Sequence, residues 1–184
     1  CIVMLILSSC KHTEDNVEKK LAEWDTILSS DPYSILDSLN EISSNSFKNE
    51  NHAYHSLLLT IARDKAYVDF ESDKRINRVV RYYDSQNTRD NNHVRALLYQ
   101  GIVRKRLGIT DSSLYLPLRR AETLFKGLRK QRPETGYMLH YFIGDTYFNN
   151  NNFSVSNDYF NKALEYAKEE KDETHIVDAY LAFF

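Results

Sequence analysis

The feature that most limits the possible folds of this chain is a helical spacing of apolar residues along almost its whole length. Apolar side chains return every three or four residues over stretches of about 12–17 residues, which places them on one face of an α-helix. Short polar stretches separate these segments. Only five glycines and three prolines occur in 184 residues, and this scarcity favours helices over a turn-rich β fold. We therefore expect an all-α protein.

Helices joined by short turns are expected to pair as antiparallel hairpins. Asp31-Pro32 supplies a helix cap and a proline at the first helical position, and Gly108 supplies a turn. The asparagines at 149–152 tolerate the left-handed backbone that ends a helix. We place Pro117 in the first turn of its helix, because an interior proline costs about 3 kcal/mol. The pattern predicts a repeat domain over 17–184, with hairpins at 17–44, 52–85, 93–130 and 134–170 and the start of another helix at 174–184.

A pattern of small and aromatic residues is clearest in residues 137–170. Counting Tyr137 as the first position, the eighth, eleventh, twentieth, twenty-fourth and twenty-seventh are Gly144, Tyr147, Ser156, Phe160 and Ala163. This resembles the tetratricopeptide repeat, in which small residues let paired helices approach closely and aromatic residues fill the space beside them. The resemblance implies hairpins stacked into a right-handed superhelix that binds peptides or helices in its concave groove.

The middle hairpin matches the repeat less closely. Gly101, Gly108 and Ala121 fit if one residue is inserted in the turn, but Arg104 stands at the aromatic position. In the best unit, His140 stands where a large apolar residue is usual. Equivalent positions lie 42 and 43 residues apart, which exceeds the 34 residues of the standard repeat. Longer second helices or longer loops are therefore expected.

The N-terminal segment resembles a bacterial lipoprotein signal peptide. An apolar run at 2–7 leads into Leu7-Ser8-Ser9-Cys10, where small residues admit a peptidase and the Cys10 thiol accepts the lipid. A basic leader is absent, so we interpret residues 1–9 as a clipped signal-peptide remnant and 10–16 as a lipidated polar tether. Cys1 and Cys10 are the only cysteines, which leaves the mature part no disulfide or catalytic thiol. The alternative is an ordinary apolar N-terminal segment.

These features together resemble exported tetratricopeptide lipoproteins of Bacteroidetes. The resemblance implies an extracytoplasmic location, anchored by lipid to the cell membrane or the outer membrane. In many such proteins the repeats precede a membrane helix and an output domain, so the chain has a second interpretation as the sensor part of a transcriptional regulator or histidine kinase in signalling. A third interpretation is a nutrient- or glycan-binding lipoprotein, but the loops are short for sugar platforms. The apolar end at 181–184 leads us to expect that the repeats continue.

The family's groove positions imply the residues that contact a partner. In the best unit they fall on Met138, Tyr141, Asp145 and Phe148, and in the middle unit on Arg95, Leu98, Ile102 and Lys105. This mixed lining suits a protein or peptide with hydrophobic anchors and acidic groups. The alternative is that these residues pack against a neighbouring helix or a terminal segment.

A local excess of positive charge lies between residues 101 and 133. Nine basic and two acidic residues give +7 there, although the whole chain carries −2. This predicts a surface for an acidic segment or an anionic head group, with solvated helix faces as the alternative. Nucleic acid is disfavoured because no aromatic platform is interleaved. The predicted basic patch comprises Arg104, Arg106, Arg119, Arg120, Arg129, Lys130 and Arg132.

The sequence contains no motif that indicates catalysis. It has no phosphate-binding glycine loop, nucleophile elbow or zinc-protease helix. His52 and His55 have only Glu50 nearby, so surface or interface histidines are favoured over a metal site, and His140 is expected to pack within the repeat. The acidic residues at 169–173 are interpreted as a solvated turn. We therefore expect a binding protein without enzymatic activity, cofactor or metal.

Overall fold

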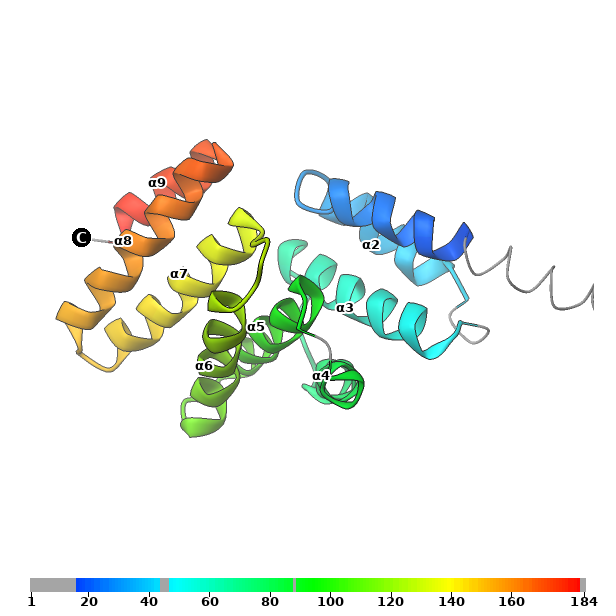
Figure 1. The fold of residues 1–184 in the computed structure, drawn as a ribbon, viewed down its shortest axis with the longest axis horizontal. Coiled ribbons are helices and arrows are strands. Elements are labelled where there is room, and N and C mark those ends of the chain that lie inside the picture. The colour runs from blue at the N-terminus through cyan, green and yellow to red at the C-terminus, as the bar shows by residue number, and fades with distance from the viewer. Residues whose placement is uncertain (1–15, 44–46, 88, 183–184) are drawn as a thin grey trace, which may run out of the picture. The chain divides into compact units, whose positions relative to one another are not determined.

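The computed structural model describes residues 16–43, 47–87 and 89–182. All regular secondary structure in these residues is helical, which confirms the all-α prediction (Figure 1). The predicted lipid-attachment residue Cys10, the signal-peptide remnant and most of the tether lie outside the described residues. The chain divides into two compact units, Cys1–Ser85 and Gln86–Phe184, which we describe separately.

Unit 1 is built from a helical segment at residues 16–27 and three further helices. These are α2 (Pro32–Glu41), α3 (Asn49–Lys65) and α4 (Lys74–Gln86). The predicted cap of α2 is confirmed, because the Ser34 amide donates to Asp31 Oδ1 at 3.2 Å. Helix α2 packs against α3, and the Tyr54 hydroxyl of α3 donates to Asp25 Oδ2 of the first segment at 3.0 Å. Fully buried leucines form the core, among them Leu21, Leu28, Leu39, Leu57 and Leu58.

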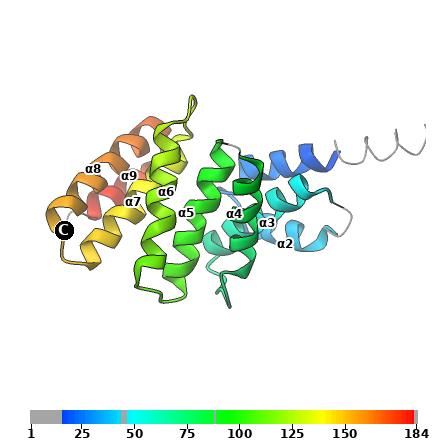
Figure 2. The same ribbon diagram turned by 60° about the horizontal axis from the view of Figure 1, so that its bottom comes forward.

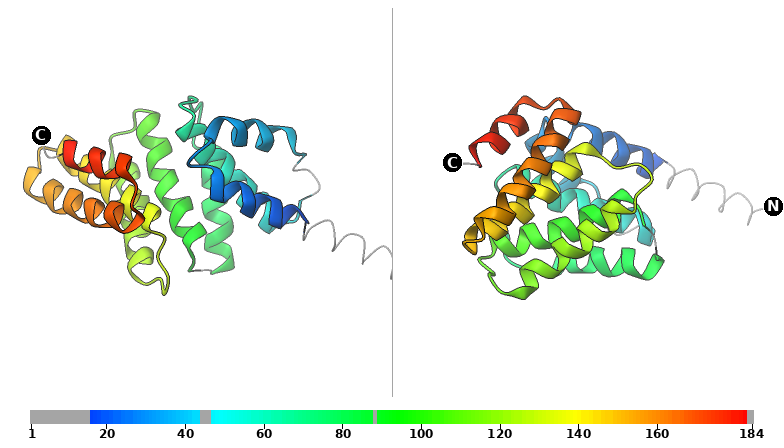
Figure 3. Two further views of the ribbon diagram at one scale, coloured as in Figure 1. Left: turned by 90° about the horizontal axis from the view of Figure 1, so that it is seen from above. Right: turned by 60° about the vertical axis from the view of Figure 1, so that its left-hand side comes forward.

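Unit 2 contains two helix hairpins and one further helix. The first hairpin pairs α5 (Asn91–Arg106) with α6 (Ser112–Lys126), and the second pairs α7 (Pro133–Asn149) with α8 (Phe153–Glu170). Helix α9 (Glu173–Leu181) packs on α8. Helix α7 also contacts both helices of the first hairpin. Figure 2 shows α5 beside α6, and the left view of Figure 3 shows α8 beside α9 in orange and red.

Each hairpin of unit 2 has the same kind of close contact between its two helices. A Cβ atom added to Gly101 of α5 would lie 2.6 Å from Cδ2 of Leu118 in α6. A Cβ atom added to Gly144 of α7 would lie 2.8 Å from Cδ1 of Phe160 in α8. In both hairpins, a glycine of the first helix therefore receives a large side chain of the second helix. This recurrence gives the fold its helical-repeat character.

The backbone angles confirm two of the predicted turn residues. Gly108 has φ +74° between α5 and α6, and Asn151 has φ +59° between α7 and α8. Both values lie in the left-handed region that glycine and asparagine tolerate. The predicted turn residues therefore end these helices for the expected physical reason.

The prediction for Pro117 is wrong. Helix α6 begins at Ser112 because the Asp111 carboxylate caps it, accepting from the Ser113 amide at 2.8 Å. Pro117 therefore lies in the second turn, where it cannot donate to the Ser113 carbonyl four residues earlier. The Arg104 guanidinium donates to that carbonyl instead, at 2.6 Å. This hydrogen bond offsets part of the cost of an interior proline.

Candidate functional site

Two of the predicted groove residues form an ion pair with each other. Lys105 of α5 pairs with Asp145 of α7, and their side chains are 32% and 26% exposed. The Asn149 side-chain amide donates to Asp145 Oδ1 at 3.2 Å, and Lys105 Nζ lies 5.8 Å from the centre of the Phe142 ring. Burial, followed by the positive charge of Arg106, lowers the pKa of Lys105. The α5 and α7 faces thus meet at a partly desolvated pair of charges.

Three predicted groove residues of α5 are buried. Arg95, Leu98 and Ile102 are 6%, 1% and 0% exposed. The Arg95 guanidinium donates to Asn92 Oδ1 at 3.1 Å. These side chains present little surface to a partner in this structure.

Two predicted groove residues of α7 contribute to packing where α7, α8 and α9 meet. Met138 and Tyr141 are partly buried against a cluster that includes Leu164 and Ala179. The Tyr141 ring lies 5.6 Å from that of Phe160. Burial, with the nearby Asp178 carboxylate, raises the pKa of Tyr141. Their environment matches the alternative interpretation, in which groove positions pack against a neighbouring helix.

Phe148 is the most exposed of the eight predicted groove residues. It is 45% exposed at the end of α7, and Phe153 at the start of α8 is 51% exposed. Their rings meet edge to face at 5.3 Å between centroids. We call Phe148 and Phe153 the exposed phenylalanine pair. Phe153 was not among the predicted groove residues, although aromatic residues flank the asparagine turn on both sides in the sequence.

The predicted basic patch is partly engaged within unit 2. Arg104 is hydrogen-bonded to the Ser113 carbonyl, and Arg119 pairs with Glu122 at 3.0 Å. The Arg132 side chain is half-buried, and its backbone amide donates to Asn91 Oδ1 at 3.2 Å. Five of its side chains are exposed, those of Arg106, Arg119, Arg120, Arg129 and Lys130.

Glu122 is the centre of a polar network between α6 and α8. Its side chain is 4% exposed and accepts from Lys126 Nζ at 2.8 Å and from the Tyr159 hydroxyl at 3.1 Å. Arg119 Nη1 also donates to the Tyr159 hydroxyl, at 2.8 Å. Burial opposes ionisation of Glu122, but the hydrogen bonds from Lys126 and Tyr159 and the charge of Arg119 outweigh it, so its pKa lies below the usual value. In the sequence, Glu122 is one of only two acidic residues within the basic stretch at 101–133, and nothing there indicates this network.

His140 occupies an aromatic environment in the core of unit 2. Its Nδ1 donates to the Gly136 carbonyl at 2.7 Å, and its ring stacks on Tyr166 at 5.2 Å between centroids. Burial lowers the pKa of His140, and the hydrogen bond to Gly136 only partly opposes this. The side chain is 4% exposed, in keeping with the predicted packing role.

One cluster in the described part of the chain has a donor set that suits a cation. Oxygen atoms of Glu170 and Asp172 and a ring nitrogen of His175 lie within 4.8 Å of one another. His175 Nδ1 is 3.1 Å from Glu170 Oε2, and its ring stacks on Tyr137 at 3.9 Å. Burial, together with the charges of Glu134 and Asp172, raises the pKa of Glu170 although His175 opposes it. Glu170 and Asp172 are half-buried, whereas Glu169 and Glu173 are exposed, so only part of this turn is solvated as expected.

Comparisons with known proteins add no further assignment. No family model, curated protein or solved structure matches this chain. The described residues contain no helix with both the length and the apolar composition needed to cross a membrane.

Proposed function

We propose that this chain is a lipid-anchored protein-interaction module that binds a partner protein or peptide along tetratricopeptide-like repeats. The repeated glycine contacts support the repeat assignment, because Gly101 and Gly144 stand at equivalent positions of two hairpins. The proposed lipid anchor rests on the sequence around Cys10, and such an anchor would hold the module outside the cytoplasm.

The observation that carries the binding proposal is the exposed phenylalanine pair. Two phenylalanines at 45% and 51% exposure leave aromatic surface in water at one hairpin turn. Aromatic residues that become buried on association supply much of the binding energy of protein interfaces. The pair therefore offers an anchor point for an apolar side chain of the partner.

The charges beside the pair define the rest of the partner segment. Asp145 and Phe148 are three residues apart on α7, so they occupy neighbouring positions on that helix. Lys105 partners Asp145, and the adjacent Arg106 is exposed. A partner segment that carries an apolar residue next to a charged residue matches this arrangement, because the partly exposed Lys105–Asp145 pair lies beside Phe148 on α7.

A site-specific crosslinking experiment tests the binding proposal. The full-length protein, expressed in its own cells, carries a photoreactive amino acid in place of Phe148 or, as a control, in place of exposed Glu165 on α8. We expect a discrete adduct from position 148 and none from 165. Crosslinking that is absent from 148, or equal at both positions, contradicts the proposed face.

The anchor is tested separately. Cells are fed an alkyne-labelled fatty acid, and the full-length protein is compared with its Cys10→Ala variant. We expect label and membrane association in the unaltered protein and the loss of both in the variant. Unlabelled wild-type protein overturns the lipid anchor and leaves the interaction surface to be judged by crosslinking.

A further inference from the structure

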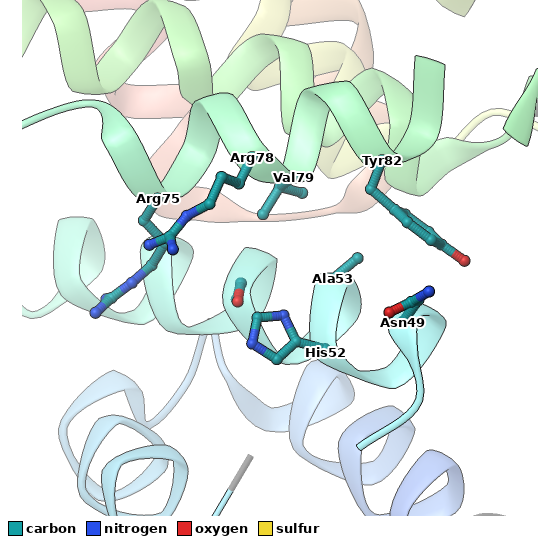
Figure 4. Close-up of a pocket in the computed structure, with 8 residues that line it drawn as sticks. Asn49, His52, Ala53, Arg75, Arg78, Val79 and Tyr82 are labelled. Carbon is teal, nitrogen blue, oxygen red and sulfur yellow. The ribbon is translucent and has the colours of Figure 1, made fainter. Parts of the chain in front are cut away.

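A pocket lies between α3 and α4 in unit 1, apart from the face described above. Its volume is about 120 Å³. Figure 4 shows side chains from both helices converging on it. Two of its lining residues, Ala53 and Val79, are apolar, and six are polar: Asn49, His52, Ser56, Arg75, Arg78 and Tyr82.

Helical spacing explains why these polar groups share one cavity. Arg75, Arg78 and Tyr82 follow one another at intervals of three and four residues on α4, so they occupy one face of that helix. His52 and Ser56 are four residues apart on α3 and likewise share a face. In Figure 4 the two arginines extend toward one end of the pocket, opposite His52, while Tyr82 and Asn49 lie at the other end.

The arginines give the pocket an uncompensated positive charge. Burial, followed by the charges of Arg63 and Arg78, lowers the pKa of Arg75. Arg63 is occupied elsewhere, because it donates to the Asp69 carbonyl at 2.5 Å. Within residues 16–43, 47–87 and 89–182, the guanidinium groups of Arg75 and Arg78 form no ion pair or hydrogen bond. Two guanidinium groups thus line one cavity without an acidic partner.

The carboxylate of Glu50 lies close enough to Tyr82, at the other end of the pocket, to affect the pKa of its phenol. Burial, with the charge of Glu50, raises the pKa of the Tyr82 phenol. The phenol therefore remains protonated and able to donate a hydrogen bond. Glu50 is exposed and is not among the residues that line the cavity.

The donor set determines the chemistry of a ligand. Guanidinium groups donate hydrogen bonds, accept none, and match the oxygens of phosphate in a two-pronged geometry. Two guanidinium groups balance the charge of a phosphate dianion, whereas a carboxylate ligand would neutralise only one of them. The hydroxyls of Ser56 and Tyr82 and the Asn49 amide add neutral donors. A volume of about 120 Å³ accommodates one phosphate group.

We propose that the α3–α4 pocket is a phosphate-binding site, with Arg75 and Arg78 as its principal ligands. The ligand is either free inorganic phosphate or the phosphate group of a small phosphomonoester. The site is independent of the exposed phenylalanine pair, so either proposal can fail without the other.

Calorimetric titration of the full chain tests the site. The probes are inorganic phosphate, glycerol 3-phosphate and acetate, each at millimolar concentration. We expect saturable binding of phosphate or glycerol 3-phosphate, and the tighter of the two identifies the source of the phosphate group. No binding of either, or acetate binding as tightly, overturns the proposal.

Matched variants locate the bound ligand. Arg78→Met removes the charge of an exposed side chain, so the fold should tolerate it, and Arg89→Met removes an exposed arginine of unit 2 that belongs neither to the pocket nor to the predicted basic patch. We expect Arg78→Met to weaken phosphate binding by about tenfold or more, because a charge-assisted contact is lost. Arg89→Met should leave the affinity unchanged. Equal affinities of Arg78→Met and wild type, with both folded by circular dichroism, contradict the site.

Discussion

The Arg104 side chain donates a hydrogen bond to the Ser113 carbonyl at 2.6 Å, across the turn between α5 and α6. This carbonyl lies four residues before Pro117, which has no amide hydrogen to donate to it. In the proposed tetratricopeptide-like pattern, Arg104 also stands at a position where an aromatic residue is usual. Arg104, which departs from the pattern, therefore supplies the hydrogen bond that Pro117 cannot make.

A double-mutant cycle tests this relationship. Arg104→Met should lower the free energy of unfolding by about 1–2 kcal/mol, since it leaves a partly buried carbonyl without a donor. In a Pro117→Ala background the loss should be smaller, because the new amide at 117 bonds to Ser113. Urea unfolding of the four proteins measures the coupling. Equal losses in both backgrounds would show that the hydrogen bond to Ser113 is unimportant, and Arg129→Met serves as the control.

The second prediction concerns the close contact in the α7–α8 hairpin. Gly144→Ala should destabilise the protein by about 1–3 kcal/mol, because its Cβ would meet the Phe160 ring at 2.8 Å in a packed core. Gly127→Ala is the matched control, since its Cβ would lie no closer than 3.4 Å to the Leu124 carbonyl and its φ is −88°. Thermal unfolding compares the two variants. A similar loss in both would contradict the close-approach role of Gly144.

The third prediction concerns the acidic end of the stability profile. The pKa of Glu122 is lower in the folded than in the unfolded protein. Its stabilisation is therefore present above the unfolded pKa of about 4.5 and is lost as pH falls through the folded pKa. Glu122→Gln should cost about 1–2 kcal/mol at neutral pH, and its difference from wild type should shrink toward pH 3. A difference that stays constant from neutral to acidic pH would exclude this ionised network.

The fourth prediction concerns His140, which is held neutral by burial. Its folded pKa lies below the unfolded value of about 6.5. The stability it provides is therefore present above pH 6.5 and is lost as pH falls below that value. His140→Phe places the large apolar residue usual in the repeat at this position, so its stability should change less between about pH 7.5 and 5.5. The pKa of His55 is lowered too, so part of the dependence of stability on pH should remain in the variant. A pH dependence equal to that of the wild type contradicts the role given to His140.

Sequence reasoning predicted the helices because periodicity and turn residues are local signals. The cap at Asp31 and the left-handed turn residues Gly108 and Asn151 match the structure. Helix α3 begins at Asn49, three residues before the predicted start at 52. The sequence gives no signal for this earlier start, because residues 49–51 are polar and Lys48 forms no side-chain cap. Pro117 was misplaced because its compensation comes from Arg104 on another helix.

The candidate sites were harder to predict because they depend on how helices meet. The Lys105–Asp145 pair joins two residues predicted to face a partner, which spacing along one helix cannot reveal. Arg75 and Arg78 share a face of α4, and they line a cavity only because α3 packs opposite them. His175 joins a cluster with Glu170 and Tyr137 only because α9 packs against α8, which the sequence does not reveal.

The central claim is that the exposed phenylalanine pair anchors a partner protein. Its most direct test is the affinity of the crosslinked partner, purified, for the full-length protein and for its Phe148→Ala and Glu165→Ala variants. We predict that Phe148→Ala weakens binding by about tenfold or more, since truncating an interface aromatic commonly costs over 1 kcal/mol, while Glu165→Ala binds like wild type. Unchanged affinity in Phe148→Ala would contradict the account.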